Sequence, residues 1–156
     1  MMKYRVNKYI LILLSMVLIA ALFIGCSTVV DEVEPVDEPS AETLDENGYY
    51  SSPEEVALYI NTYGKLPVNY ITKSEASKLG WDSQKGNLWD VTDKMIIGGD
   101  KFGNREKLLP AADGRIYYEC DVNYEGGYRG SERLVFSNDG LIFYTEDHYE
   151  SFEQLY

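Results

Sequence analysis

One histidine and a close pair of arginines are the residues of this sequence best suited to chemistry. His148 is the only histidine, and an unperturbed imidazole changes its charge near neutral pH, so it can give or accept a proton. Arg129 and Arg133 follow a Gly-Gly-Tyr sequence, and only two other arginines occur from residue 49 onward. Because neighbouring guanidinium groups bind phosphate or carboxylate, this spacing predicts a local anion site. A purely structural arginine pair is the alternative interpretation.

Strands of alternating polarity are expected to bring a carboxylate beside this arginine pair. In residues 116–121 one face is apolar and the other carries Glu119, since side chains of a strand point alternately to its two faces. Arg133 falls on the non-core face of the next strand in the same way. If these strands are neighbours, Glu119 and Arg133 meet on one exposed surface, and the loop after the following strand brings His148 over it. A surface salt bridge and an ordinary loop histidine are the simpler alternatives.

Helix signals precede the strands. Capping-box patterns predict helices starting at Ser52 and at Thr72, and glycines predict their ends at residues 64 and 80. Ala76 and Leu79 would form the apolar face of the second helix, and a short helical turn is expected at 87–91. Strands are expected at 116–121, 131–136, 141–145 and 152–155. This order predicts an α+β domain, with N-terminal helices packed on a C-terminal antiparallel β-sheet.

The first 26 residues are typical of an export signal. Three bases and no acid precede or begin a long apolar run from Tyr9 to Ile24. The sequence Phe23-Ile24-Gly25-Cys26 resembles a bacterial lipobox, in which Cys26 is lipidated and becomes the new N-terminus. A plain signal peptide cut nearby and an uncleaved anchor are the alternatives. The expected location is extracellular, with anchorage to the outer face of the membrane if Cys26 is acylated.

An acidic stretch at 27–48 separates this signal from the folded domain. Residues 31–50 contain eight acids and no base. Such a segment buries too little apolar surface to offset its chain entropy, so a disordered, extended tether is expected. An acidic mimic of RNA that inhibits the domain is the alternative. The domain would span 49–156, and residues 51–156 carry 18 acids and 11 bases, a net charge of −7.

The cysteines and the histidine argue against a disulfide and a zinc site. Only Cys120 remains after Cys26, so the exported domain has no internal disulfide, and strand parity places the Cys120 thiol in the core. One histidine with two separated cysteines gives no zinc ligand set, and no EF-hand spacing occurs. No metal or other cofactor is therefore expected. Nothing in the sequence indicates an oligomer, and a monomer is expected.

Eight short segments occur in order along the last two-thirds of the chain. They are LPVNYITKSEA (66–76), LGW (79–81), KGNL (85–88), IGGD (97–100), FGNRE (102–106), DVNY (121–124), GYR (127–129) and DHY (147–149). In sequence and spacing, the chain from Tyr50 onward resembles the barnase/binase family of bacterial guanyl-preferring ribonucleases. The resemblance implies the α+β microbial ribonuclease fold.

The resemblance also implies roles for individual residues. Glu119 matches the general base of the family and His148 its general acid. The cations around the scissile phosphate would be Arg129, Arg133 and Lys73. Asp121 matches a buried acid that holds the arginines, and Tyr149 an aromatic that packs against the bound base. The guanine-recognition loop would comprise Phe102, Asn104, Arg105 and Glu106.

The implied reaction is cleavage of single-stranded RNA 3′ of guanosine. RNA carries its own nucleophile, the 2′-hydroxyl, so an endoribonuclease of this kind needs a base, an acid and cations but no metal. The first product would be a 2′,3′-cyclic phosphate, which water then opens. Guanine preference would come from backbone N–H groups of Asn104 and Arg105 on O6 and from the Glu106 carboxylate on N1 and N2.

Three departures from the family pattern qualify this expectation. Gly103 replaces a frequent serine, Tyr118 stands where a basic residue is frequent, and the domain is unusually acidic, which slows the capture of a polyanion. The family also implies a small acidic barstar-like cytoplasmic inhibitor as a partner. A catalytically weak or inactive surface-displayed binding module of the same fold is the alternative function, and a toxin domain used against competing cells is a third.

Overall fold

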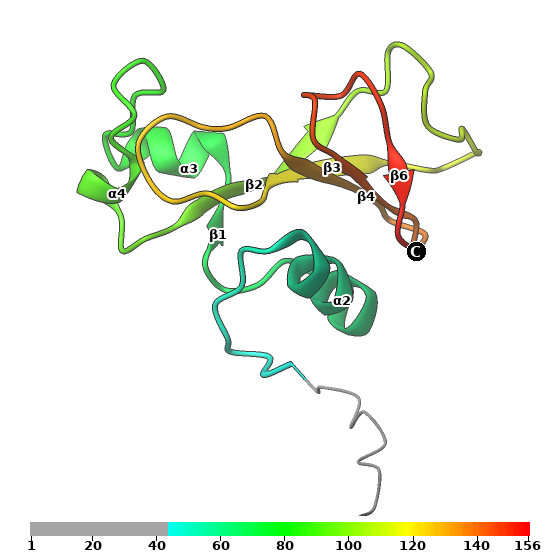
Figure 1. Ribbon diagram of the computed structural model, residues 1–156, viewed down its shortest axis with the longest axis horizontal. Coiled ribbons are helices and arrows are strands. Elements are labelled where there is room, and N and C mark those ends of the chain that lie inside the picture. The colour runs from blue at the N-terminus through cyan, green and yellow to red at the C-terminus, as the bar shows by residue number, and fades with distance from the viewer. Residues whose placement is uncertain (1–43) are drawn as a thin grey trace, which may run out of the picture. The chain divides into compact units, whose positions relative to one another are not determined.

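The computed structural model of the protein describes residues 44–156. These residues form a six-stranded sheet whose strands lie side by side in chain order (Figure 1). The strands are β1 (Tyr70–Ile71), β2 (Ile96–Phe102), β3 (Tyr117–Asp121), β4 (Arg133–Ser137), β5 (Ile142–Thr145) and β6 (Glu153–Gln154). The β1–β2 pair is parallel and every other neighbouring pair is antiparallel. With the helices preceding most of the sheet, the predicted α+β fold is confirmed.

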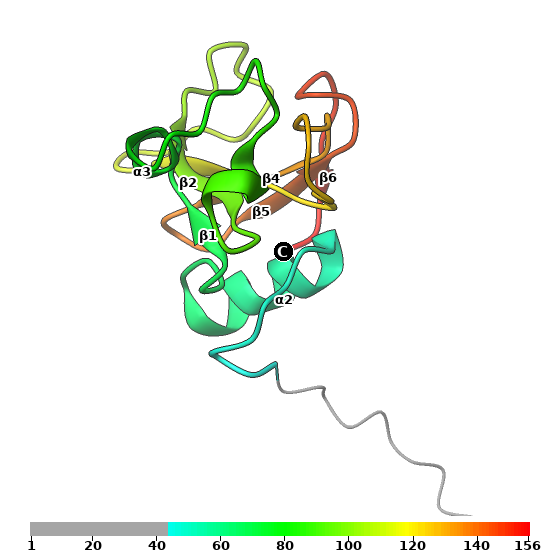
Figure 2. The same ribbon diagram turned by 90° about the vertical axis from the view of Figure 1, so that its left-hand side faces the viewer.

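Helix α2 (Pro53–Tyr63) forms where the capping signals predicted it. Ser52 is the N-cap and accepts a hydrogen bond from the Glu55 backbone N–H, and Gly64 ends the helix with φ +67°. The helix packs Val56 and Ile60 against the sheet, in one cluster with side chains of β3, β4 and β5. Figures 1 and 2 both show α2 on one face of the sheet, opposite the loop that follows β2 and the segment between β5 and β6.

Two shorter helices follow α2 in the chain. Helix α3 (Lys73–Lys78) starts in a complete Thr72–Glu75 capping box, and α4 (Leu88–Val91) follows it. Ala76 is fully buried, but Leu79 is 54% exposed. The prediction that Leu79 shares the buried apolar face of this helix with Ala76 is therefore wrong, because the helix ends at Lys78 and Leu79 is already its C-cap.

Strands β1 and β2 had no counterpart among the predicted strands. Gly98 and Gly99 interrupt β2, and its pairing with β3 shifts register between Gly98 and Asp100. A Cβ atom on Gly98 would lie 2.6 Å from the Cβ of Cys120 and 2.6 Å from the ring of Tyr70. A glycine is therefore needed for the close approach of neighbouring strands, and it removes the alternating pattern that signals a strand.

The sheet is buried on both faces, which corrects the expected exposed surface. The face away from α2 carries its own apolar cluster of Leu109, Tyr117, Val135 and Phe143. Glu119, Asp121 and Arg133 lie on this face and are only 8%, 2% and 3% exposed. Ile116, expected in the core, is 39% exposed, while Cys120 is buried as expected. The loop after β2 and the segment before β6 supply Leu109 and Phe152 and so cover the site face.

The packed part of the chain extends upstream of Tyr49. The Tyr59 and Tyr63 hydroxyls donate to the backbone oxygens of Glu46 (2.7 Å) and Leu44 (2.5 Å), and Lys65 pairs with the Glu46 carboxylate. Residues 44–48 thus pack with α2 rather than serving only as tether. The export signal, Cys26 and the tether up to residue 43 lie outside the described residues. No helix within 44–156 has the length and apolar character needed to cross a membrane.

Candidate active site

Glu119 lies in the middle of β3 with its carboxylate held from two sides. Lys73 Nζ contacts Oε1, and the Tyr149 hydroxyl donates to Oε2 at 2.5 Å. Burial by itself raises the pKa of the Glu119 carboxyl, but the hydrogen bonds from Lys73 and Tyr149 and the nearby charge of Arg129 lower it further than burial raises it. The resulting pKa is below the usual value, so Glu119 is a carboxylate at neutral pH.

Lys73 reaches Glu119 because the start of α3 is fixed. Lys73 is the first residue of the helix, directly after the Thr72 cap. Its backbone N–H donates to Asp100 Oδ2 at 3.0 Å, which attaches the helix start to β2. Since Asp100 pairs with Glu119 in the sheet register, one β2–β3 pair positions both the carboxylate and the ammonium. The Lys73 side chain remains 40% exposed and open to a ligand.

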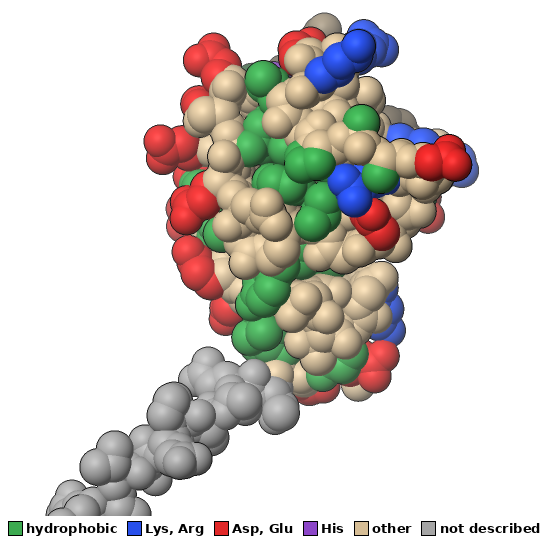
Figure 3. All heavy atoms as spheres, turned by 90° about the vertical axis from the view of Figure 1, so that its right-hand side faces the viewer, with side chains coloured by type: hydrophobic (Ala, Val, Ile, Leu, Met, Phe, Trp, Pro, Cys, Tyr) green, Lys and Arg blue, Asp and Glu red, His purple; other side chains and the backbone are tan. Residues whose placement is uncertain are grey.

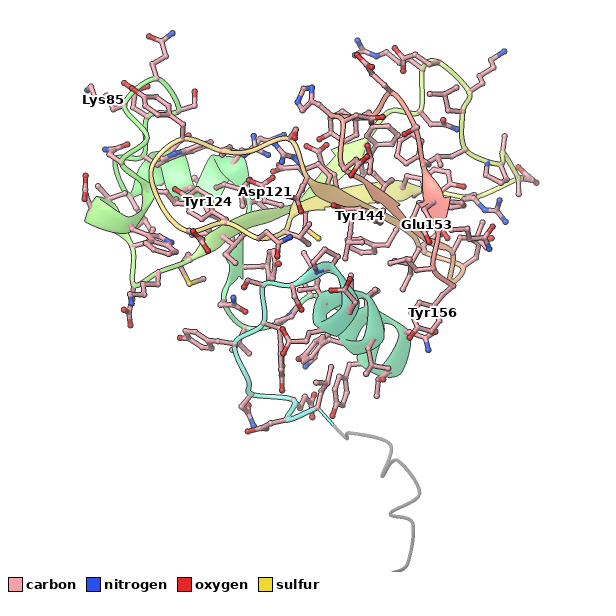
Figure 4. All side chains as sticks on the ribbon, in the orientation of Figure 1. Lys85, Asp121, Tyr124, Tyr144, Glu153 and Tyr156 are labelled. Carbon is pink, nitrogen blue, oxygen red and sulfur yellow. The ribbon has the colours of Figure 1, made fainter. Side chains whose placement is uncertain are left out.

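Asp121 lies between the two arginines, two residues after Glu119 and on the same face of β3. Figure 4 shows Asp121 near the middle of the sheet. Arg129 donates from Nε to Oδ2 and from Nη2 to Oδ1, both at 2.6 Å, and Arg133 Nε lies 2.9 Å from Oδ1. Burial alone lowers the pKa of the Arg129 guanidinium, but its bonds to Asp121 raise it above the usual value. Arg129 therefore stays charged, and the Asp121 carboxylate holds both arginines in fixed positions.

Arg133 is the more deeply buried arginine. Its Nη1 donates to the backbone oxygens of Gly130 (2.9 Å) and Glu132 (2.7 Å). Its Nε is close enough to Asp121 for an ion pair, yet the angle is too poor for a hydrogen bond, and the atom has no other partner within the described residues. We take the ion pair as the main contact, because attraction between opposite charges depends far less on angle than a hydrogen bond does.

His148 and Tyr149 lie in a tight loop between β5 and β6. Both have left-handed backbones, with φ values of +59° and +76°, which is uncommon for residues other than glycine. Asp147 stabilises the loop by accepting from the Thr145 and Ser151 hydroxyls at 2.8 and 2.5 Å. It also accepts from the backbone N–H groups of residues 150 and 151. The pattern Asp147-x-x-x-Ser151 is the sequence signal that would have indicated this turn.

The two aromatic residues of the loop differ in their burial. The His148 ring lies on the surface, 4.7 Å between centroids from the Tyr149 ring. The Tyr149 ring is half-buried, its hydroxyl reaches Glu119, and its centroid lies 5.2 Å from that of Phe102. Burial, followed by the bond to Glu119, raises the pKa of the Tyr149 phenol, so the phenol stays protonated as a donor. Tyr149 thus links the candidate acid to the candidate base.

The expected guanine-recognition residues form a closed turn after β2. Asn104, with φ +40°, donates from Nδ2 to the Leu109 oxygen (2.9 Å) and accepts from the Leu109 N–H (3.1 Å). Phe102 ends β2 and packs on Tyr149. The side chains of Arg105 and Glu106 are exposed and make no ion pair or side-chain hydrogen bond within residues 44–156. The structure places this turn beside the catalytic candidates, joined to them through Phe102.

Comparison with known proteins decides the family. A family model of ribonucleases matches residues 53–156. The chain belongs to the ribonuclease family. Over 100 residues it is 53% identical to a ribonuclease of Heyndrickxia coagulans, a match that covers 64% of this chain and 92% of that protein. A ribonuclease of Bacillus intermedius is also 53% identical over 100 residues, which is 62% of its length.

A further relative is the guanyl-specific ribonuclease St of Saccharopolyspora erythraea. It is 47% identical over 55 residues, which is 35% of this ribonuclease and 54% of that protein. The expected resemblance to the barnase/binase family is confirmed by the family model and by the Bacillus relative. Membership makes RNA the substrate class.

The ribonuclease gathers oppositely charged groups on one face of its sheet. Glu119 and Asp121 supply two negative charges, and Lys73, Arg129 and Arg133 supply three positive ones. His148 and the recognition turn lie next to this cluster through Tyr149. Within residues 44–156, no three His, Cys, Asp or Glu side chains converge in a way that could hold a metal ion. The charged cluster, with His148 beside it, offers groups for proton transfer and for the stabilisation of an anion.

Proposed function

We propose that this protein is an exported endoribonuclease that cleaves single-stranded RNA on the 3′ side of guanosine. The observation that carries the proposal is the ionised Glu119, held by Lys73 and Tyr149 beside two fixed guanidinium groups. The family match supports ribonuclease activity, and the site geometry supports the individual roles below.

The first step is transesterification. The Glu119 carboxylate takes the proton of the 2′-hydroxyl, and the resulting oxygen attacks the adjacent phosphorus. His148, protonated, donates its proton to the departing 5′-oxygen. The bond between phosphorus and that oxygen breaks, leaving a 2′,3′-cyclic phosphate. General acid and base groups of this kind each contribute on the order of 10²–10⁴-fold in rate. Water then opens the ring with the two roles exchanged.

The cations stabilise the charge that builds up on the phosphorane oxygens. Arg129 and Arg133 are already oriented by Asp121, so they need no reorganisation during the reaction. Lys73 is the most exposed of the three side chains, and its ammonium can turn from Glu119 toward the phosphate once Glu119 is protonated. We propose that no metal ion takes part, because the nucleophile belongs to RNA and these three residues supply the positive charge.

Guanine preference is assigned to the turn at 102–106. Backbone N–H groups at Asn104 and Arg105 would donate to O6, and Glu106 would accept from N1 and N2, while Tyr149 and Phe102 provide apolar contact with the base. The Asn104–Leu109 bonds hold this turn in one conformation. Adenine has a donor where guanine has O6, so its binding would leave buried donors unpaired.

One assay tests the reaction and its residues. The purified protein is given a short RNA with a single guanosine, in the presence of a chelator. We expect a cyclic phosphate at that guanosine, with the rate reduced at least about 10²-fold in Glu119→Gln and in His148→Ala. Glu153→Gln, an exposed β6 residue, is the charge-matched control and should keep the wild-type rate. Wild-type rates in both site variants would overturn the roles, and complete loss with chelator would overturn metal independence.

We further propose that the ribonuclease acts outside the cell as a monomer, anchored by a lipid on Cys26, and that a small acidic barstar-like inhibitor protects the cytoplasm. The signal sequence supports export, and the three cations of the site offer a local surface for an acidic inhibitor. Labelling with a radioactive fatty acid should mark the wild type but not Cys26→Ser. Equal labelling of both would refute lipid attachment at this residue.

A further inference from the structure

A hollow lies beside the recognition turn, outside the cluster formed by Glu119, Asp121 and the three cations. It has a volume of about 970 Å³, the size of a small-molecule site. Its walls include Lys101, Phe102, Lys107, Leu108, Pro110 and Ile116. We call it the loop groove, because it lies between the 103–116 loop and the ends of β2 and β3. None of the residues proposed as acid, base or phosphate-binding cation lines it.

The loop groove combines apolar surface with positive charge. Leu108 and Ile116 are 54% and 39% exposed, which is high for large aliphatic side chains. Figure 3 views the molecule from the side on which the 103–116 loop projects in Figure 1. It shows hydrophobic side chains in a band, with Lys and Arg side chains on one flank, where some acidic ones lie beside them, and a row of acidic side chains along the opposite margin.

Every charged residue that lines the loop groove is a cation. Lys101 and Lys107 make no ion pair within residues 44–156, whereas Arg115 is neutralised by Asp139 through Nε and Nη2 at 2.9 and 2.7 Å. The two lysines are thus available to an anionic ligand. The apolar side chains between them would suit a flat ring better than a small inorganic ion.

The walls of the loop groove are held in place. Two side chains converge on the backbone oxygen of Pro110: Arg115 Nη1 at 2.9 Å and the Tyr117 hydroxyl at 2.7 Å. At the other end, the paired bonds between Asn104 and Leu109 close the recognition turn. The groove is therefore built by cross-links of the 103–116 loop, and a ligand would find it largely preformed.

We propose that the loop groove binds the nucleotide on the 5′ side of the guanosine. This inference rests on the proposed function. The recognition turn borders both sites: Phe102 packs on Tyr149, whose hydroxyl donates to Glu119, and Phe102, Gly103 and Asn104 also line the loop groove. A guanine on this turn directs its 3′-phosphate to Glu119 and the arginines, so the strand that continues past the turn is the 5′ strand. Its base packs on Leu108 and Ile116, and its phosphate pairs with Lys101 and Lys107.

Substrate extension tests this subsite kinetically. The values of kcat/KM are compared for the RNA dinucleotide GpC, the trinucleotide CpGpC and the control GpCpC. In the wild type, the 5′ extension should raise kcat/KM at least about threefold, and added salt should reduce this gain. In the double variant Lys101→Gln/Lys107→Gln, the ratio of CpGpC to GpC should fall toward one. Lys65→Gln/Lys94→Gln has the same change in net charge away from the groove and should keep the wild-type ratio.

Binding of uncleavable DNA analogues tests the 5′ subsite in the loop groove independently of catalysis. Methyl resonances of Leu108 and Ile116 should shift when the 2′-deoxy trinucleotide CpGpC is added, and much less with 2′-deoxy GpC or GpCpC. A 5′ extension that neither raises kcat/KM nor shifts these methyl groups would overturn the subsite, even if cleavage after guanosine is normal. Failure to cleave any substrate, with the methyl shifts present, would instead count against the proposed reaction alone.

Discussion

Replacing Asp121 by asparagine should cost this protein a large part of its stability. Asp121 and Arg133 are 2% and 3% exposed, and the carboxylate is the counter-ion of both Arg133 and Arg129. Asparagine keeps the shape but removes the charge, which leaves a buried guanidinium uncompensated. Breaking a buried pair in this way costs about 3–5 kcal/mol. A loss of about 4 kcal/mol, with a urea m value of about 2 kcal/mol/M, lowers the unfolding midpoint by about 2 M.

A second aspartate–arginine pair of the same protein provides the control. Asp139 accepts from Arg115 Nε and Nη2 at 2.9 and 2.7 Å, but its side chain is 44% exposed. The Arg115 side chain is 16% exposed against 3% for Arg133, so water can reach Arg115 when the Asp139 carboxylate is lost, and Asp139→Asn should move the urea midpoint far less than Asp121→Asn. Circular dichroism during urea titration of both variants measures the difference. Equal midpoint shifts would refute the reasoning, because burial would then not determine the cost of losing the carboxylate.

Three further outcomes follow from single contacts. Tyr149→Phe removes a donor to the Glu119 carboxylate, so the pKa of Glu119 rises and the acidic limb of kcat/KM against pH should move to higher pH. Gly86→Ala should destabilise more than Gly64→Ala in urea: both have positive φ, but only a Cβ at Gly86 would meet backbone atoms, the nearest at 2.8 Å. The Ser151 hydrogen bonds, followed by those from neighbouring backbone and Thr145, lower the pKa of Asp147 to about 2. Its folded pKa is depressed from an unfolded value of about 4, so its contribution to stability is complete above pH 4 and is lost as the pH falls toward 2. Asp147→Asn should lack that part of the acid dependence of the urea midpoint.

A specific result would contradict each of these three predictions. An unchanged acidic limb in Tyr149→Phe would mean that the phenol does not influence the ionisation of Glu119. Equal urea midpoints for Gly86→Ala and Gly64→Ala would mean that the backbone at Gly127 and Tyr128 can move away from the new Cβ without loss of stability. If wild type and Asp147→Asn lost stability in parallel between pH 4 and pH 2, the carboxylate would not be what holds its loop at low pH.

The features that sequence predicted well are those encoded by a few neighbouring residues. Helix α2 followed from the Ser52 cap and the Gly64 stop, which act locally. Strand alternation correctly placed Glu119 and Cys120 on opposite faces of β3, where they pair with Val135 and Leu134 of β4. Local signals of this kind do not depend on the contacts that distant segments make.

The features that sequence missed depend on distant segments. Strand β2 contains a glycine pair that removes its alternating pattern, and the need for Gly98 follows only from the close approach of Tyr70 and Cys120. The face of the sheet that carries Glu119 has polar residues by parity, yet it is covered by a loop and a C-terminal segment that carry Leu109 and Phe152. No local sequence pattern predicts that these segments cover the face. The contact between Tyr149 and Glu119 joins residues 30 positions apart and follows only from the fold.

The charge balance of the site explains how so acidic a domain can act on RNA. Glu119, Asp121, Lys73, Arg129 and Arg133 together carry a net charge of +1, and charges farther than about 8 Å through water are largely screened at physiological salt. In the proposed reaction Glu119 becomes neutral when it takes the 2′-proton, so the cluster rises to +2 as the phosphorane gains its second negative charge. The site therefore attracts the transition state more strongly than the bound substrate, which is the condition for catalysis rather than mere binding.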